Sequence, residues 1–255
     1  MKSRRVRVLA LLAALAAAVG VAVTVLPASA DQPADEPAAA PRDACFTFDR
    51  ALGEGANGED VRQLQIRVSG YPATGEVLGL DGDFGPATKA AVTRFQQAYG
   101  LSASGTADQA TFDKIYELSD DDCSPVNFDF GELNNCNADW SGGKVDAAAA
   151  KGNALVTMWK LQAMRHAMGD APIVVNGGFR SVACNDSVGG AANSRHLYGD
   201  AADLGAGSQG FCGLAQEARN HGFSEILGPG YPDHDDHTHV ANRADQFWSA
   251  PNCGI

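Results

Sequence analysis

Apolar side chains recur every three or four residues in three short stretches of the first half of the chain. This spacing gathers them on one face of a helix, so it predicts helices over residues 60–68, 86–99 and 108–116. Pro86 stands where a helix can begin without losing a hydrogen bond, and Gly100 stands where a helix can end. We therefore predict a small all-α domain of three helices.

The second half combines long helical patterns with short apolar runs. Residues 144–168 have a helical period that ends before Gly169, and residues 211–221 form a second helical stretch. Short apolar runs predict strands at residues 173–176, 201–204, 225–227 and 237–240. Because these helices and strands do not alternate regularly, we expect an α+β domain with an antiparallel sheet.

An acidic stretch separates the two halves. Residues 118–125 contain successive aspartates and end in proline, a composition typical of a boundary between domains. We therefore place the first domain at residues 43–123 and the second at residues 124–255.

The chain begins like an exported protein. A basic start is followed by an apolar, Ala-rich run over residues 8–25 and by the small residues Ala28-Ser29-Ala30, which are typical of a cleavage site. We predict a signal peptide at residues 1–30. A retained membrane anchor is the alternative, because the run approaches membrane-spanning length. The Ala- and Pro-rich residues 31–42 are predicted to be a propeptide or leader.

Net charge and cysteine content add to this picture. The formal net charge is −12, which argues against a nucleic-acid partner. An even number of cysteines in an exported chain indicates disulfides, whereas metal ligation would favour close cysteine pairs, and there are none. We favour sequential pairing because it keeps each bridge within one domain: Cys45–Cys123, Cys136–Cys184 and Cys212–Cys253.

Histidines and acidic residues gather in two stretches of the second half. His196 and Asp203 lie in the first stretch, and His237 and His239 in the second. Two imidazoles and a carboxylate are a common zinc set when the metal keeps a position open for water. The spacing alone leaves open whether His237, His239 or both would bind the metal. His166 and His221 are expected at helix surfaces or ends, and we assign them no catalytic role.

The first domain resembles a known family. The segments GEDVRQLQ (58–65) and DGDFGPATKAAV (81–92), with Phe95-Gln96 and the later Gly100 and Gly105, are similar to the peptidoglycan-binding domain of bacterial wall enzymes. Most of these residues are expected in the hydrophobic core. Wall binding is therefore implied by the resemblance and by no single residue.

The second domain resembles zinc D-alanyl-D-alanine carboxypeptidases and the related vancomycin-resistance dipeptidases. The resemblance rests on Ser194-x-His196-x-x-Gly199-x-Ala201-x-Asp203 together with Asp236-x-x-His239. With the wall-binding domain and six cysteines, the match is close to the secreted actinobacterial type. It implies one zinc ion per chain, held by His196, Asp203 and His239.

The resemblance also implies roles for neighbouring side chains. Asp236 stands at the position of the family's acid/base carboxylate, where relatives often have the longer Glu. His234 or His237 would therefore share or take over proton transfer. Arg180, in the segment Gly177–Ser181, would bind the substrate's terminal carboxylate as a bidentate fork. A structural salt bridge is the alternative for Arg180.

These features together predict a secreted, wall-associated monomer. We expect it to hydrolyse the terminal D-Ala–D-Ala bond of peptidoglycan peptides, with no nucleic-acid partner and no membrane association after signal removal. An endopeptidase that cuts peptidoglycan cross-links by the same zinc chemistry is the enzymatic alternative. A non-catalytic wall-binding protein is the alternative from another class.

Overall fold

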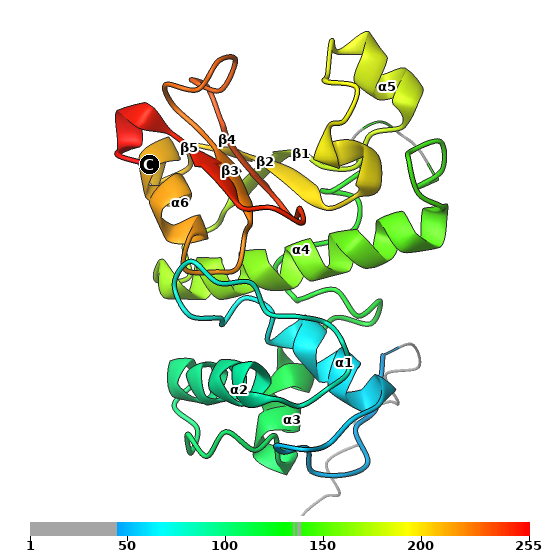
Figure 1. Ribbon diagram of the computed structural model, residues 1–255, viewed down its shortest axis with the longest axis vertical. Helices are drawn as coiled ribbons and strands as arrows, with labels where there is room; N and C mark the ends of the chain where they lie inside the picture. Colours follow the sequence, from blue (N-terminus) through cyan, green and yellow to red (C-terminus); the bar gives the residue numbers. More distant parts are fainter. Residues whose placement is uncertain (1–44, 135, 137–138) are drawn as a thin grey trace, which may run out of the picture. The chain divides into compact units, whose positions relative to one another are not determined.

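The computed structural model describes residues 45–134, 136 and 139–255 (Figure 1), and the predicted signal peptide and leader lie outside them. The described residues belong to one compact unit that spans Arg42–Ile255. Among them, no helix is long and apolar enough to cross a membrane.

The three helices predicted in the first half are confirmed to within one residue at each end. They are α1 (Glu59–Arg67), α2 (Pro86–Ala98) and α3 (Gln109–Glu117). Pro86 is the first residue of α2, and the side chain of Asp108 caps α3 by accepting a hydrogen bond from the Thr111 amide. Their apolar faces form a common core, which includes Val61, Leu64, Val92, Phe95, Phe112 and Ile115.

The long helix of the second half is α4 (Ala147–Ala167). It begins later than predicted because Asp146 caps it, accepting a hydrogen bond from the Ala149 amide. The other predicted helix is α6 (Gly210–Ala218). The second half contains more helices than the sequence predicts, since three short ones were missed: α5 (Val182–Ser187) and the 3₁₀ turns η1 (Arg195–Tyr198) and η2 (Pro251–Cys253).

The sheet has five strands in the order β1-β2-β4-β3-β5. They are β1 (Val174–Gly177), β2 (Ala201–Gly205), β3 (Glu225–Leu227), β4 (Thr238–Ala241) and β5 (Phe247–Ser249). The prediction of a purely antiparallel sheet is wrong, because β5 pairs with β3 in parallel. The chain reverses direction after β3 and reverses again after β4. Strand β5 therefore runs in the same direction as β3 and pairs with the edge of β3 that β4 leaves free.

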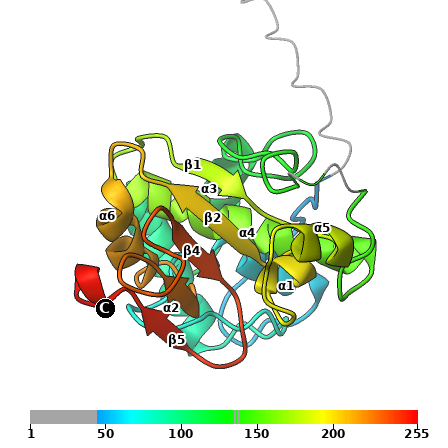
Figure 2. The same ribbon diagram turned by 90° about the horizontal axis from the view of Figure 1, so that it is seen from above.

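Helix α4 packs against both the sheet and the helical domain. It contacts β2 and η1 as well as α1, and Figures 1 and 2 show it crossing beneath the strands. The core between α4 and the sheet contains Met158, Leu161, Leu204, Phe223, Ile226 and Val240. This packing fixes the strands that carry the histidine stretches.

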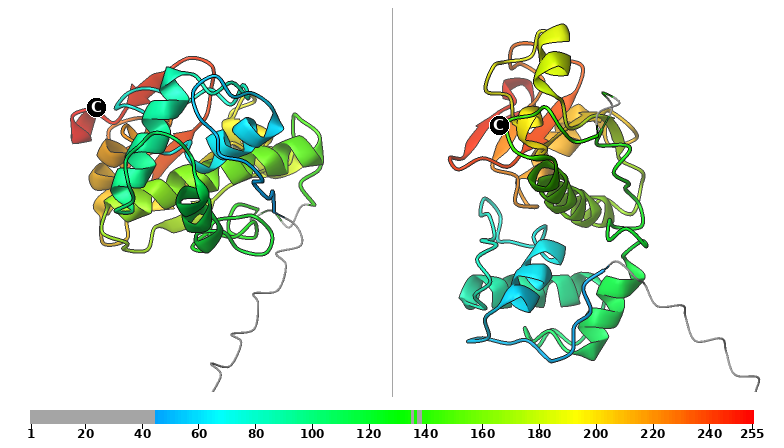
Figure 3. Two further views of the ribbon diagram at one scale, coloured as in Figure 1. Left: turned by 90° about the horizontal axis from the view of Figure 1, so that it is seen from below. Right: turned by 90° about the vertical axis from the view of Figure 1, so that its right-hand side faces the viewer.

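Two histidines without a predicted role join the helical domain to the rest. His221 Nδ1 lies 2.7 Å from the Gly70 carbonyl oxygen, and His166 Nε2 lies 3.1 Å from that of Ala98. The His166 ring also stacks on Tyr99, with 4.4 Å between ring centroids. Figure 3 shows α1–α3 as a group on the side of α4 away from the sheet.

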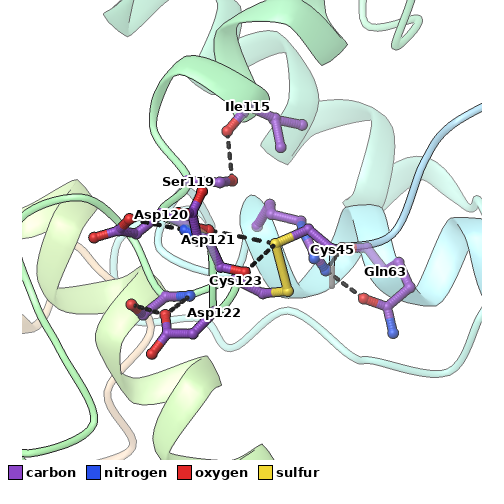
Figure 4. The surroundings of a disulfide bond; sticks show 10 residues. Cys45, Gln63, Ile115, Ser119, Asp120, Asp121, Asp122 and Cys123 are labelled. Atoms are coloured by element: carbon purple, nitrogen blue, oxygen red, sulfur yellow. Dashed lines mark hydrogen bonds between the residues drawn. A yellow bond between two sulfur atoms is a disulfide. The ribbon is translucent and has the colours of Figure 1, made fainter. Parts of the chain in front are cut away.

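The cysteines lie in three pairs at disulfide distance. The pairs are those of the sequential arrangement: Cys45 with Cys123, Cys136 with Cys184, and Cys212 with Cys253. Figure 4 shows the first pair beside the acidic boundary stretch, where Ser119 Oγ donates a hydrogen bond to the Ile115 carbonyl. This pair joins the two ends of the helical domain.

Candidate metal centre and catalytic site

Strand pairing brings together two of the three predicted zinc ligands. Asp203 on β2 and His239 on β4 are directly opposite each other in the antiparallel register. Because successive side chains of a strand point to opposite faces, a slip by one residue would turn His239 away from Asp203. The register of two central strands therefore fixes this half of the site.

The third predicted ligand, His196, lies on the short turn η1, which α4 holds in place. Asn153 of α4 donates a hydrogen bond to the Tyr198 carbonyl. Gly199 then turns the chain into β2 with φ at 77°, and a Cβ there would lie 2.3 Å from the Ala150 carbonyl oxygen. Glycine meets both the left-handed conformation and this close approach.

The side chains of His196, Asp203 and His239 converge at one buried point. One ligand atom from each lies within 4.8 Å of the others. His196 Nε2 is 3.1 Å from Asp203 Oδ1 and 3.2 Å from His239 Nδ1. His239 Nδ1 is 2.9 Å from the same carboxylate oxygen. Two nitrogens and one oxygen in a buried cluster match the preferences of zinc.

Hydrogen bonds to the outer nitrogens fix which nitrogen of each ring faces the cluster. His196 Nδ1 lies 2.6 Å from the Gly178 carbonyl oxygen. A carbonyl can only accept, so Nδ1–H donates and the lone pair of Nε2 points inward. The His196 ring is therefore oriented to bind a metal through Nε2.

In His239 the other ring nitrogen, Nδ1, faces the cluster, and the residues that fix this orientation were not predicted from the sequence. Its Nε2 lies 3.2 Å from Glu225 Oε1, which leaves Nδ1 to face the cluster. Glu225 Oε2 in turn accepts a 2.6 Å hydrogen bond from Arg243. A carboxylate behind a ligating imidazole is a common support in zinc sites. An acidic residue at the start of a buried strand was the only signal for Glu225.

Burial and neighbouring charges shift the pKa values of the three cluster residues. Burial would raise the pKa of Asp203, but His196 and His239 outweigh it and hold this pKa well below its usual range. Burial lowers the pKa of His196. For His239, burial also lowers the pKa, but hydrogen bonds to Asp203 and Glu225 prevail and raise it to about 9. Metal binding at this cluster must therefore compete with a proton.

Arg180 lies on the other side of the Asp203 carboxylate. Its Nη2 donates a 2.6 Å hydrogen bond to Asp203 Oδ2, while Oδ1 faces the histidines. The backbone amide of Arg180 donates to the His196 carbonyl. The salt bridge that the sequence analysis held as the alternative is thus present, and the carboxylate-anchor role stays a prediction.

Two more histidines stand next to the cluster. His237 Nε2 lies 3.6 Å from Asp203 Oδ1, and its Nδ1 lies 2.8 Å from Asp236 Oδ1. The side chain of Asp236 is 91% exposed, and among the described residues its side-chain hydrogen bond is with His237. The hydrogen bond from His237 lowers the pKa of Asp236.

His234 completes the group. Its ring centroid lies 4.6 Å from that of His237 and 5.9 Å from that of His239. Its Nδ1 lies 2.7 Å from the Pro232 carbonyl oxygen, so Nε2 carries the lone pair. Burial lowers the pKa of His234, which favours the neutral imidazole.

The structure thus gathers every side chain that the sequence singled out for this site. The predicted ligands contact one another directly, and Arg180 and His237 contact Asp203. The His234 ring lies beside the rings of His237 and His239. Asp236 is the exception, since it reaches the group through His237. A three-ligand cluster beside two further imidazoles has the groups needed to hold a metal and to move protons.

Comparisons with known proteins agree with both halves of the chain. A family model described as Peptidase M15 matches residues 126–241, and one for a peptidoglycan binding domain matches residues 57–115. The chain is similar to a zinc D-Ala-D-Ala carboxypeptidase of Streptomyces albus G, with 74% identity over 213 residues that cover 84% of each chain. It is also similar to a spore cortex-lytic enzyme of Oceanobacillus iheyensis, with 37% identity over 79 residues, which are 29% of this chain and 26% of that one.

Proposed function

The chain belongs to the M15 peptidase family, among the zinc D-Ala-D-Ala carboxypeptidases, and we propose that it hydrolyses the C-terminal D-Ala–D-Ala bond of peptidoglycan stem peptides. The observation that carries this proposal is the convergence of three ligand atoms from His196, Asp203 and His239 within 4.8 Å. The oriented lone pairs of both imidazoles support zinc as the metal. When bound, zinc supplies a Lewis acid that polarises a carbonyl oxygen and lowers the pKa of a water molecule.

In this proposal, the proton carriers are the two neighbouring imidazoles. His237 is the nearer one, and Asp236 holds its Nδ1–H so that Nε2 faces the reaction. His234 presents a neutral Nε2 on the same side. One imidazole takes the proton of the attacking water and one delivers a proton to the leaving amine. The exposed Asp236 acts by orienting His237, because its carboxylate does not reach the cluster.

Arg180 is proposed to bind the negative charge of the substrate. Its Nη2 is engaged with Asp203, while the side chain keeps 23% of its surface exposed at the edge of the cluster. The remaining donors of the guanidinium would bind the terminal carboxylate, as a planar fork does in other proteins. A carboxypeptidase needs such a cation because its substrates end in a free carboxylate.

The first half of the chain is proposed to hold the enzyme on the wall. We assign wall binding to residues 43–123 and hydrolysis to residues 124–255, in agreement with the two matched families. The three cysteine pairs are consistent with disulfides formed after export. We therefore place the protein outside the cell, as a monomer released from its signal peptide.

Product analysis tests the reaction. Mass spectrometry should show that a pentapeptide ending in D-Ala-D-Ala loses one D-Ala, that a chelator stops the loss, and that zinc restores it. A cross-linked peptide dimer should be cut more slowly. Preferential cleavage of the dimer would instead identify an endopeptidase. Full activity of the metal-free protein would refute the zinc mechanism.

A further inference from the structure

A shallow cavity of about 540 Å³, open to solvent, lies beside the Cys45–Cys123 pair. Its walls come from the first described residues, α1, the segment before α4 and the first turns of α4. Figure 4 shows Gln63, one of its lining residues, close to Cys45. None of the lining residues belongs to η1, β2 or β4, so the cavity is separate from the metal cluster.

A buried cation without a salt bridge lines this cavity. Arg67 is only 3% exposed, and its Nη1 donates hydrogen bonds to the backbone and side-chain oxygens of Gln63. It forms no ion pair with any residue that the structure describes. Burial lowers the pKa of Arg67 to about 10, so the side chain remains charged at neutral pH. Glu59 is near enough to favour the charged form but forms no salt bridge with Arg67. Burying a charge that has no direct ionic contact is costly, which favours an anionic ligand.

A second cation stands at the same cavity. The Lys151 ammonium lies 4.3 Å from the centroid of the Phe130 ring. Within residues 45–134, 136 and 139–255 it has no ion-pair partner. Asp122 is the one acidic residue among the lining side chains, and its Oδ1 accepts hydrogen bonds from the amide and hydroxyl of Ser124. Two cations without a salt bridge at one cavity stand out in a chain of net charge −12.

Part of the lining is apolar. Phe46, Phe130 and Leu155 are half-buried and line the cavity. Cavities of this volume accommodate small ligands or a few peptide residues. An aliphatic or aromatic wall next to two cations suits a molecule that carries a carboxylate beside an apolar group.

We propose that this cavity is a second, non-catalytic site for a carboxylate-bearing peptide of the wall polymer. Arg67 and Lys151 hold the carboxylate, and the apolar wall contacts the adjoining side chain. The inference rests on the proposed function, because it takes peptidoglycan peptides to be the ligands of this protein. A polymer that repeats its peptides could then bind at both sites of one molecule, which strengthens retention on the wall.

Peptide binding to the zinc-loaded full chain tests this site. The probe is a soluble peptide with a single C-terminal D-Ala, which the proposed reaction does not shorten. Binding is followed by the NMR signals of the isotope-labelled phenylalanine rings of Phe46 and Phe130. Lys151→Gln should raise the Kd read from these signals by roughly tenfold, because a charge-assisted contact is lost. Lys144→Gln, which removes an exposed lysine outside the lining, should leave it unchanged.

Two further measurements separate this site from the catalytic one. The amidated peptide should bind at least about tenfold more weakly, and Lys151→Gln should keep the hydrolysis rate of a soluble substrate within about twofold of wild type. Ring signals that do not respond to the peptide, or equal affinities of Lys151→Gln, Arg67→Gln and wild type, would overturn the second site. Absence of hydrolysis by the wild type would contradict the proposed function itself, whatever the ring signals show.

Discussion

At the residue scale, the carboxylate behind His239 determines how that imidazole meets the metal. Glu225 holds Nε2, Arg243 holds Glu225, and Nδ1 is left to face Asp203. We expect Glu225→Gln to weaken zinc affinity by about 10- to 100-fold, because the amide no longer stabilises the ligating imidazole. Competition with a chromogenic chelator measures this change.

The control for that prediction is Glu217→Gln. Glu217 also contacts a histidine, His221, but this pair lies at the junction with the helical domain. Its removal should leave zinc affinity unchanged. Equal zinc affinities of Glu225→Gln and wild type would show that Glu225 does not support the metal.

A second residue-scale prediction concerns proton transfer. His237→Asn should lower kcat/KM by about 10²- to 10⁴-fold while zinc content stays full, since the loss of a general acid or base has this size. Asp236→Asn should cost less, because the exposed carboxylate only orients His237. Steady-state kinetics with metal analysis would check both, and a larger loss in Asp236→Asn would make Asp236 the proton carrier.

At the element scale, periodic patterns in the sequence were sufficient to predict the long helices. The helices α1–α4 and α6 have enough repeated apolar positions to be recognised locally. The turn η1 and helix α5 are too short for such a signal. Strand β5 was missed because its parallel pairing with β3 depends on a return of the chain that no local pattern shows.

In the site, too, residues in a local motif could be predicted from the sequence, whereas residues brought in by tertiary packing could not. His196, Asp203 and His239 could be predicted because they lie in a recognisable motif pair, and the structure brings them together. Glu225 could not, because it reaches His239 from a neighbouring strand. The Arg180–Asp203 pair also depends on tertiary packing, since 23 residues separate the two side chains.

Gly199 gives an element-scale prediction, because it joins η1 to β2. Gly199→Ala combines a left-handed conformation with a Cβ 2.3 Å from the Ala150 carbonyl oxygen. We expect it to reduce the free energy of unfolding by about 2 kcal/mol or more. Gly213→Ala, inside α6 with only ordinary contacts, should be neutral or stabilising by up to about 1 kcal/mol. Denaturant unfolding compares them, and equal effects would contradict the argument.

At the scale of the whole molecule, a buried lysine makes stability depend on pH. Lys160 donates a 2.7 Å hydrogen bond to the Gly222 carbonyl, and its ammonium lies 5.6 Å from the Phe223 ring centroid. Burial lowers the pKa of Lys160 to about 7, although the charge of Asp200 opposes the shift. The unfolded chain therefore binds one more proton than the folded chain between about pH 7 and pH 10.

By linkage, the contribution of Lys160 to the free energy of unfolding rises as pH increases through this range. The Tm of wild type, measured relative to that of Lys160→Met, should therefore rise from pH 7 to pH 10. Lys144→Met, a change at an exposed lysine, should show no such trend. A constant Tm difference for Lys160→Met would mean that Lys160 remains protonated throughout.

The pairing of β2 with β4 also governs when the protein can become an enzyme. Asp203 and His239 meet only in that register, and 36 residues of chain separate them. A polypeptide still emerging from the ribosome can carry His196 and Asp203 before His239 has been added, and then has no complete site. Metal capture, and with it hydrolytic activity, is thereby delayed until almost the entire chain has been delivered and folded.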